Sequence, residues 1–516
     1  MHSIYLIFLP IFLSLLILLV SKKSFFSLLV GFLSACLIYS SFDLAKFVGI
    51  VLHSIRIIFY NDGLKFWNIA VLIFLPILAT LSCLMEESGG VAAFSKWLKT
   101  KLKTKKQAEV LVVILGIIIY LDGYFSAIIV GSVGSSFSSS YKISKAKIAY
   151  YVDSTSAPIC PMIPISSWGA SILGILASLV ASSTLIHASP SEIFISLIPY
   201  EFFTFVVLAM LFVVALGGLN IAKMNDIESK YELNKKDESE SINKVHKLKN
   251  SGHISFITGI LLLIFVTLIL VVIEGYHNSH SFNILKIISS SNLALDMVYG
   301  SLISLIIYFL LVRKDINAKS LAKLLKINYI FTFKTIIILL LAWSMINAIL
   351  ALGIDKEIIT LLKTYHISSS FLPLALFLIA MFLSFVSGTS WGTFYLLIPI
   401  AFVLGSAYGL HEVVVFVAAA ITGSVFGDNC SLISDTTIIS ASASNCTLEA
   451  HYSSQIPYAL VCGLIACLMW FVYGLSNSLG LAYLFLVLGL VVFYFFAKKR
   501  CLKNKNKGDI KALGAN

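Results

Sequence analysis

Long apolar runs recur along the whole chain and are separated by short polar stretches. The clearest runs cover residues 4–20, 66–84, 193–216, 256–273, 296–312, 335–352 and 479–497. Each run approaches or exceeds the roughly 20 residues that an α-helix needs to cross a bilayer. With a hydropathy window of about 19 residues, we expect about 10 to 13 transmembrane helices. The pattern therefore predicts an all-α membrane protein.

The composition agrees with this fold class and argues against others. Hydrophobic residues make up 59% of the chain and charged residues only 12%, whereas soluble domains carry about 25% charged residues. The net charge of +12 does not indicate a nucleic-acid partner, because the lysines lie in short loops such as 22–23, 96–106 and 142–147. Lysines in such loops mark the cytoplasmic side. The eight cysteines show no metal-ligand spacing, and we expect no cofactor.

Placing every lysine cluster in the cytoplasm gives a topology with a cytoplasmic C-terminus. Residues 108–141 do not fit this topology as one helix, because a single crossing would put Lys142 outside. The conflict disappears if the chain folds back near Asp122-Gly123. A re-entrant hairpin of this kind is tolerated where it is buried in protein or lines a cavity. Residues 45–60 are interpreted as interfacial or re-entrant.

The order of features in the first half recurs in the second half. Residues 66–104 and 333–365 each contain a long apolar helix, a break at small residues and an amphipathic stretch with lysine. Glycine-containing interruptions follow in 108–136 and 371–404, and an Asp-x-x-Ser motif follows each of them. On the lysine topology the two copies cross the membrane in opposite directions. Inverted repeats with interrupted helices are common in secondary transporters, whose sites lie where the helices break.

The stretch 217–252 is the clearest hydrophilic segment, and we interpret it as a cytoplasmic linker between the two halves. The predicted organisation is N-terminal helices in 1–60, a first transport repeat in 61–216, the linker in 217–252, connecting helices in 253–327, a second transport repeat in 328–476, and a last helix with a basic cytoplasmic tail in 477–516.

The segment around Asp428 combines acids and hydroxyls inside apolar sequence. Asp428 and Asp435 lie in the motif GDNCSLISDTT, and a carboxylate at a helix centre costs about 2.5–3.5 kcal/mol even on lenient insertion scales. Ser431 and Thr436 supply hydroxyl oxygens, and hard cations such as Na⁺ prefer oxygen ligands. We therefore predict that this segment binds Na⁺, with Asp428 as a ligand. The alternative for Asp435 is a polar loop in which it caps a helix that begins at Thr436.

A second acid, Asp153, lies beside prolines that cannot continue a regular helix. Ser154, Thr155 and Ser156 follow it directly and supply further hydroxyls. We predict that Asp153 is the second carboxylate ligand of the Na⁺ site. Asp122, in the motif YLDGYFS, is a third intramembrane acid and a further candidate ligand. The alternative for Asp153 and Asp122 is an ordinary loop at a helix end.

Residues 388–392 read G-T-S-W-G and match the G-x-S-x-G nucleophile elbow of serine hydrolases. That elbow requires a preceding strand and partner acid and histidine residues, whereas an apolar helix is expected here. An intramembrane serine hydrolase is therefore the weaker alternative, and we do not expect an enzyme. On the preferred interpretation, Thr389 and Ser390 supply hydroxyl ligands at a helix break. His451 is interpreted as structural rather than as a proton relay.

Five stretches together resemble the NhaC-type sodium/proton antiporter family. They are CLMEESGG (83–90), YLDGYFSAIIVGS (120–132), KIAYYVDSTSAPICPMIPISSWG (147–169), SGTSWGTFYLLIPIA (387–401) and GSVFGDNCSLISDTTIIS (423–440). They occur in family order and, with the connecting helices, cover most of residues 66–460. The combination carries the resemblance, since no single stretch is specific.

The resemblance implies export of Na⁺ in exchange for H⁺ by alternating access, in a bacterial inner membrane. It maps the family's conserved acids onto Asp122, Asp153, Asp428 and Asp435. The expected partners are the lipid bilayer, Na⁺ and H⁺, with a homodimer as the assembly to test.

Departures from the family pattern keep a second function open. Relatives commonly have histidine and proline where this chain has Asn429 and Leu432, and often paired aspartates where it has Asp122-Gly123. Losing a histidine and a carboxylate removes two proton carriers. The alternative function is therefore a sodium-coupled symporter or exchanger of a small organic acid or amino acid.

Overall fold

The computed structural model of the protein describes residues 4–60, 63–233 and 252–513. Within these ranges the chain forms α-helices and short 3₁₀ turns, and no strand. Nine helical segments of the described residues are long and apolar enough to cross a membrane, and four shorter apolar helices accompany them. The prediction of an all-α, multi-pass membrane protein is thus confirmed.

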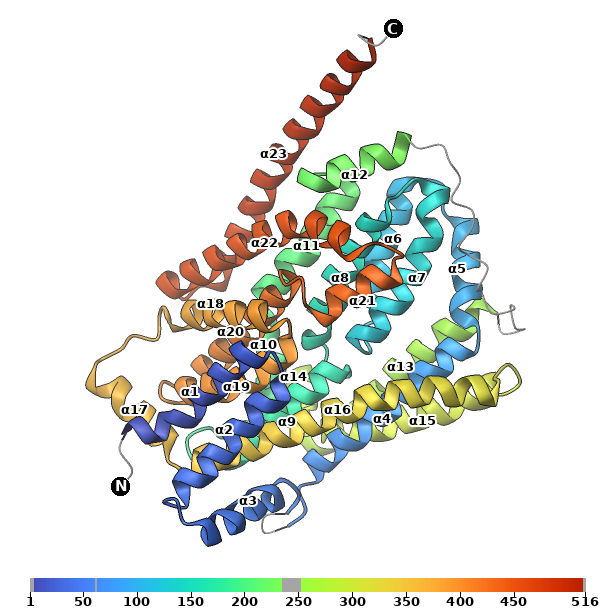
Figure 1. Cartoon of the computed structure of the whole chain (residues 1–516). Helices are drawn as coiled ribbons and strands as arrows, with labels where there is room; N and C mark the ends of the chain where they lie inside the picture. Colours follow the sequence, from blue (N-terminus) through green and yellow to red (C-terminus); the bar gives the residue numbers. More distant parts are fainter. Residues whose placement is uncertain (1–3, 61–62, 234–251, 514–516) are drawn as a thin grey trace.

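The first three helices of the described chain are α1 (Ile4–Ser21), α2 (Ser24–Tyr39) and α3 (Leu44–Phe59). α1 and α2 pack along each other and are joined by a tight turn, in which Lys22 adopts the left-handed conformation (φ 55°). α3 covers the segment interpreted as interfacial or re-entrant, and only its Ser54 and Ile58 are buried. Figure 1 shows α3 at the edge of the molecule, below α2.

Two helices fold back on each other to form hairpin 1: α6 (Lys105–Ile118) and α7 (Gly123–Tyr141). Tyr141 Oη, at the end of α7, donates to the backbone oxygen of Leu102, just before α6 (3.1 Å). The two ends of the hairpin therefore lie together, and the chain folds back at Asp122 as the lysine pattern predicts. Asp122 also caps α7, because its carboxylate accepts hydrogen bonds from the amides of Tyr124 and Phe125.

A discontinuous helix lies beside hairpin 1 and consists of α8 (Lys145–Ile159), a 3₁₀ turn (Cys160–Met162) and α9 (Ser167–Ser182). Pro161 and Pro164 lie in the break. Proline has no backbone N–H, so neither residue can donate the hydrogen bond that would continue an α-helix. Ser166 caps α9. The tip of hairpin 1 meets the break, since the Ser167 amide donates to the Leu121 oxygen (2.9 Å).

The second half contains the same two kinds of element. Hairpin 2 consists of α18 (Leu372–Ser387) and α19 (Ser390–Ser406), and the second discontinuous helix of α20 (Leu410–Asn429) and α21 (Asp435–Ala443). Tyr408 Oη donates to the Ile367 oxygen (2.7 Å), which joins the two ends of hairpin 2. At its tip Gly388 is left-handed (φ 68°), and a side chain there would collide with Ile433 in the α20–α21 break.

The remaining helices surround these elements. They are α4 (Phe66–Glu87), α5 (Gly90–Lys101), α10 (Pro190–Leu197), α11 (Phe202–Gly217), α12 (Ala222–Leu233), α13 (His253–Ser279), α14 (Ile284–Ser290), α15 (Leu293–Val312), α16 (Ala318–Ala351), α17 (Ile354–Thr364), α22 (Leu448–Ser476) and α23 (Leu479–Leu513). α16 has 34 residues and is therefore about 51 Å long. It runs beside α4 and packs against α2 and α9 (Figure 1).

The start of the predicted linker 217–252 is helical. α12 lies within it, whereas residues 234–251 fall outside the described part of the chain. Glu228 of α12 accepts a hydrogen bond from the Ser144 amide (2.6 Å) and pairs with Lys105 (2.7 Å). α12 is thus fixed to the start of hairpin 1 and to the start of α8.

Small residues let α20 approach α18 closely. A Cβ at Gly423 would meet the Phe377 oxygen, and one at Gly427 would meet the Met381 oxygen, both far inside contact distance. Glycines spaced four apart allow such backbone contact between membrane helices. Gly427 therefore serves helix packing within α20, which continues as a helix to Asn429.

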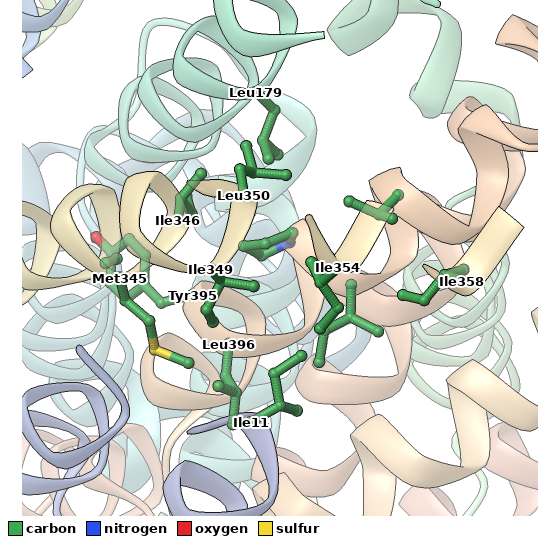
Figure 2. Close-up of a pocket in the computed structure, with 14 residues that line it drawn as sticks. Ile11, Leu179, Met345, Ile346, Ile349, Leu350, Ile354, Ile358, Tyr395 and Leu396 are labelled. Atoms are coloured by element: carbon green, nitrogen blue, oxygen red, sulfur yellow. The ribbon is translucent and has the colours of Figure 1, made fainter. Parts of the chain in front are cut away.

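An apolar interface separates hairpin 2 from α16 and its neighbours. Figure 2 shows Leu396 of α19 and Ile349 of α16 lining a small cavity, together with Ile354 of α17. The cavity holds only about 30 Å³. Tyr395 lies at this interface and also lines a larger cavity.

Candidate functional site

α21 brings the two predicted carboxylates into one buried cluster. Thr436 Oγ1 donates to Asp428 Oδ2 (3.1 Å), and Thr437 Oγ1 donates to Asp153 Oδ2 (3.1 Å). Ser440, one turn further along α21, donates to Asp153 Oδ1 (3.4 Å). Asp153 comes from α8 and Asp428 from α20, so the cluster joins the two discontinuous helices.

α22 completes the surroundings of Asp153. Gln455 Nε2 donates to Asp153 Oδ2 (2.6 Å) and to the Asn429 backbone oxygen (2.9 Å), so one amide links α8 to the end of α20. His451, one turn earlier, places its Nε2 3.5 Å from Asp153 Oδ2 and is fully buried. His451 is therefore not interfacial but buried, with its ring beside the Asp153 carboxylate.

Several polar atoms around the cluster have no partner among the described residues. They are both side-chain polar atoms of Asn429, Oε1 of Gln455 and the Oγ of Ser156. Leaving a buried polar group unsatisfied costs about 1–3 kcal/mol. The amide and hydroxyl oxygens among them are therefore available to a small ligand that needs oxygen donors.

The cluster is also short of positive charge. Asp153 is 0% and Asp428 2% exposed, and within the described ranges neither pairs with a lysine or arginine. The nearest lysine along α8, Lys147, pairs instead with Glu109 of α6 (3.0 Å). Buried carboxylates without such partners need a cation, a proton or dense hydrogen bonding.

The other predicted hydroxyl ligands are buried near the cluster but differ in their contacts. Ser431 lies in the α20–α21 break, where its amide donates to the backbone oxygen of Asp428 (2.9 Å). Thr155 Oγ1 donates to Tyr151 in its own helix (2.8 Å) and packs on Gly116. Ser154 is buried as well, and within the described part of the chain neither its hydroxyl nor that of Ser431 is hydrogen-bonded to Asp153 or Asp428.

Asp122 and Asp435 lie at the helix tips, outside the carboxylate cluster. Asp122 Oδ2 accepts from Ser167 Oγ (2.6 Å). Asp435 is the first residue of α21 and accepts from Tyr124 Oη of hairpin 1 (3.3 Å). Ser434, rather than Asp435, caps α21. The two acids therefore connect hairpin 1 with both discontinuous helices.

Thr389 and Ser390 lie at the tip of hairpin 2. Thr389 caps α19, and Ser390 Oγ donates to the Ser424 backbone oxygen of α20 (3.3 Å). Their hydroxyls are thus used to form the tip, and they are not in contact with the carboxylate cluster. The tips of the two halves also meet directly, because Trp168 and Trp391 pack with their ring centroids 4.9 Å apart.

The sequence reasoning missed Gln455 as a site residue and undervalued His451. The signal available was their spacing of four, which places both on one face of a helix that follows the second acidic motif. Tyr124 was also missed, because only the fold brings it to Asp435.

Comparisons of the sequence identify relatives of the chain. A sequence model of the Na⁺/H⁺ antiporter family matches residues 159–475, which is more than half of the chain. A Haemophilus influenzae protein described only as uncharacterized is 29% identical over 501 residues, covering 95% of each sequence.

A solved structure of low sequence identity shares the fold. The YdaH transporter of Alcanivorax borkumensis superposes with a TM-score of 0.59 at 11% identity, covering 88% of this chain and 98% of that one. MtrF of Neisseria gonorrhoeae, described as illustrating a class of antimetabolite efflux pumps, gives a TM-score of 0.49 at 16% identity over 84% of this chain and 85% of that one. The family match and the fold identify a secondary transporter rather than a hydrolase, and the chain belongs to the Na⁺/H⁺ antiporter family.

Proposed function

We propose that the protein exchanges Na⁺ for H⁺ at the cluster of Asp153 and Asp428, in a bacterial inner membrane with the C-terminus in the cytoplasm. The observation that carries the proposal is the junction at α21, where adjacent threonines hold the two buried carboxylates. Membership of the Na⁺/H⁺ antiporter family supports the choice of ions.

The chemistry of the cluster makes Na⁺ and H⁺ compete. A bound Na⁺ would take carboxylate oxygens from Asp153 and Asp428, with amide and hydroxyl oxygens from Asn429, Gln455 and Ser431 nearby. Protonation of a carboxylate removes the charge that holds the cation. The cluster can therefore carry one ion or the other, which couples their movements in opposite directions.

The arrangement of the elements suits alternating access. Each discontinuous helix carries one carboxylate, and a hairpin tip meets each break. In secondary transporters, one repeat or bundle moves against the other around a central site. Here hairpin 2 lies against α16 across the apolar interface of Figure 2, where few polar contacts resist movement.

The proposal is tested with purified protein in proteoliposomes that contain a pH-sensitive dye. An inward Na⁺ gradient should alkalinise the lumen, because each Na⁺ that enters drives protons out. Asp428→Asn keeps the shape of the side chain but cannot carry a negative charge. We expect it to lower the apparent Na⁺ affinity about 10- to 100-fold. This is the ratio of dissociation constants that corresponds to losing an interaction with a charged group worth about 1.5–3 kcal/mol.

Asp296→Asn is the matched control, because Asp296 is a buried acid on α15 outside the cluster. It should exchange ions at the rate of the unaltered protein. Full exchange by Asp428→Asn, or equal loss in both variants, would show that the cluster is not the ion site.

A further inference from the structure

One buried acid lies outside the carboxylate cluster and has no cationic partner. Glu201 lies between the 3₁₀ turn Ile198–Tyr200 and α11, and the residue is only 1% exposed. Within the described ranges no lysine or arginine forms an ion pair with it. Among the same residues, its carboxylate accepts a side-chain hydrogen bond only from Thr204 Oγ1 (3.4 Å). An acid buried in a membrane protein without a cation beside it is costly, and such acids mark functional positions.

Helix capping does not account for this acid. Glu201 occupies the N-cap position of α11, but its carboxylate accepts no hydrogen bond from the backbone amides of the first turn. Ser166 and Thr389, by contrast, each cap a helix with their hydroxyl oxygen. The burial of Glu201 therefore has no counterpart in the stability of α11 that a serine or threonine could not supply better.

Hydroxyl groups lead from Glu201 towards the carboxylate cluster. Thr204 is the one polar residue of α11, and its Oγ1 lies 3.4 Å from Glu201 Oε2 and 3.4 Å from the backbone oxygen of Pro158 in α8. α11 packs against α8. On α8, Ser156 follows Asp153 by three residues and so lies on the same helix face. Its buried Oγ has no partner among the described residues, which leaves this hydroxyl free to take part in a chain of hydrogen bonds.

In the other direction, aromatic side chains connect the turn that holds Glu201 with a polar cavity. The ring of Tyr200, the preceding residue, packs against Tyr473 of α22 and His411 of α20, with centroids 5.5 and 6.0 Å apart. His411 Nε2 and Tyr473 Oη are 2.9 Å apart. Both line a cavity of about 120 Å³, whose other polar side chains are Ser369, Ser370, Glu412 and Asn477. Titratable groups thus lie directly beside the turn before α11.

This cavity faces outwards on the topology of the proposed function. Tyr483, near the start of α23, donates to the backbone oxygen of Pro199 (2.9 Å) and is close enough to Glu201 for their charges to interact. Leu479–Arg500 of α23 is long and apolar enough to cross the membrane. With the C-terminus in the cytoplasm, the start of α23 lies at the outer face. Protons that exchange for exported Na⁺ come from that face, so Glu201 lies between their source and Asp153.

We propose that Glu201 is a proton-relay residue, which takes protons from the outer cavity between α20 and α22 and passes them along α8 to Asp153. The inference rests on the proposed function and gives the proton a path of its own. In each cycle a proton adds to the Glu201 carboxylate and leaves it again. The Thr204 hydroxyl accepts that proton and donates its own onward, so no other bond changes. The partial positive charge at the N-terminus of α11 stabilises the carboxylate while the proton is absent.

The test compares two exchange modes of the purified full-length protein in proteoliposomes. Na⁺/H⁺ exchange is recorded with an internal pH dye, and Na⁺/Na⁺ exchange as uptake of radioactive Na⁺ into liposomes loaded with unlabelled Na⁺. The second mode needs the carboxylate cluster and alternating access but no proton relay. Glu201→Gln should lower the rate of Na⁺/H⁺ exchange about 10-fold or more, since a missing proton-transfer group typically costs at least that much. Its rate of Na⁺/Na⁺ exchange and its Na⁺ affinity should be those of the unaltered protein.

Further variants separate proton transfer from packing. Glu201→Asp keeps a carboxyl group and should exchange Na⁺ for H⁺ faster than Glu201→Gln. Thr204→Val keeps the shape of the side chain without its hydroxyl and should slow only Na⁺/H⁺ exchange, whereas Thr204→Ser should retain both modes. Glu192→Gln is the matched control, because Glu192 is an exposed acid on the neighbouring α10. The Tm of each variant in detergent reports whether it is folded.

Two results would overturn the relay. The first is Na⁺/H⁺ exchange at the unaltered rate in Glu201→Gln. The second is an equal loss of both modes, or a lower Na⁺ affinity, in the folded variant, which would assign Glu201 to packing or to Na⁺ binding. If Glu201→Gln does not fold, the same comparison between Thr204→Val and Thr204→Ser decides. Failure of the proposed function differs from all of these, because the unaltered protein itself would then show no Na⁺/H⁺ exchange.

Discussion

Asp153 is a buried carboxylate whose hydrogen-bond donors come from two other helices. Thr437 and Ser440 reach it from α21 and Gln455 from α22. Hydrogen bonds to a charged acceptor are stronger than those to a neutral one. These neutral donors can stabilise the carboxylate when no ion is bound. A fixed cation in their place would compete with Na⁺ for the carboxylate. The residue is thereby kept in position for an exchangeable ion.

Gln455 gives the first prediction at this scale. Gln455→Leu removes the amide that donates to Asp153 Oδ2 and to the Asn429 backbone oxygen. Both buried acceptors then lose this hydrogen bond. We expect the apparent KM for Na⁺ to rise about 10-fold in the proteoliposome assay. Ser453→Ala is the control, because Ser453 lies on the same helix and its hydroxyl donates only to the backbone oxygen of Ala450. This variant should have the KM of the unaltered protein. An unchanged KM in Gln455→Leu would remove Gln455 from the site.

Lys147 gives a prediction about stability. It is 1% exposed, pairs with Glu109 and lies next to Tyr151, which also donates to Glu109 (2.9 Å). Lys147→Met should destabilise the protein by about 3–5 kcal/mol, because Glu109 is left as an uncompensated buried charge. Thermal unfolding in detergent should show a lower Tm for Lys147→Met and partial recovery in Lys147→Met/Glu109→Leu. Equal Tm values in the two variants would contradict a coupled pair.

The sequence predicted the central acids but not their surroundings. Asp153 and Asp428 were identifiable because carboxylates inside apolar segments are costly and rare. The spacing of His451 and Gln455 places them on one helix face, but the sequence did not show that this face packs against Asp153, because tertiary packing decides which helix is its neighbour. Thr389 and Ser390 had suitable oxygens in a suitable break, but a hairpin turn uses those hydroxyls for its own cap and for α20.

The discontinuous helices depend on close packing against the hairpins. α20 lies between α18 and α19, and its Gly423 and Gly427 bring it to the backbone of α18. This contact fixes the end of α20, where Asp428 lies. Packing at these glycines therefore affects the carboxylate cluster without any polar contact.

Gly427→Ala gives a prediction at this scale. Its methyl group would collide with the Met381 oxygen and force α20 away from α18. We expect a lower Tm and at least a severalfold loss of exchange, since overpacking typically costs about 1–3 kcal/mol. Gly49→Ala in α3 is the control, because nothing lies near its Cβ position. Wild-type stability and exchange in Gly427→Ala would show that α20 can move without affecting the cluster.

Among the elements, the sequence was most informative where two rules conflicted. Apolar length favoured one helix across residues 108–141, whereas the lysine rule required both ends on one side, and the structure folds back at Asp122. The docking of the α1–α2 turn onto α19 could not be predicted, because the contact of Ser24 with Gly392 joins residues far apart in the sequence.

In the whole molecule, the two halves contribute equivalent parts to one centre. Each supplies a hairpin and a discontinuous helix with a carboxylate, and the tips meet at Trp168–Trp391 and at Tyr124–Asp435. The long α16 and the apolar interface of Figure 2 form the surroundings against which these parts can move. Ion exchange at the centre is the claim on which the functional account depends.

Proton release on Na⁺ binding tests that claim most directly. Purified protein in weakly buffered detergent solution is mixed with NaCl, and a pH dye records the protons released, with choline chloride as the ionic-strength control. Since Na⁺ and H⁺ share Asp153 and Asp428, NaCl should release protons from the unaltered protein and none from Asp153→Asn/Asp428→Asn. No release from the unaltered protein, or the same release from the double variant, would contradict exchange at this cluster.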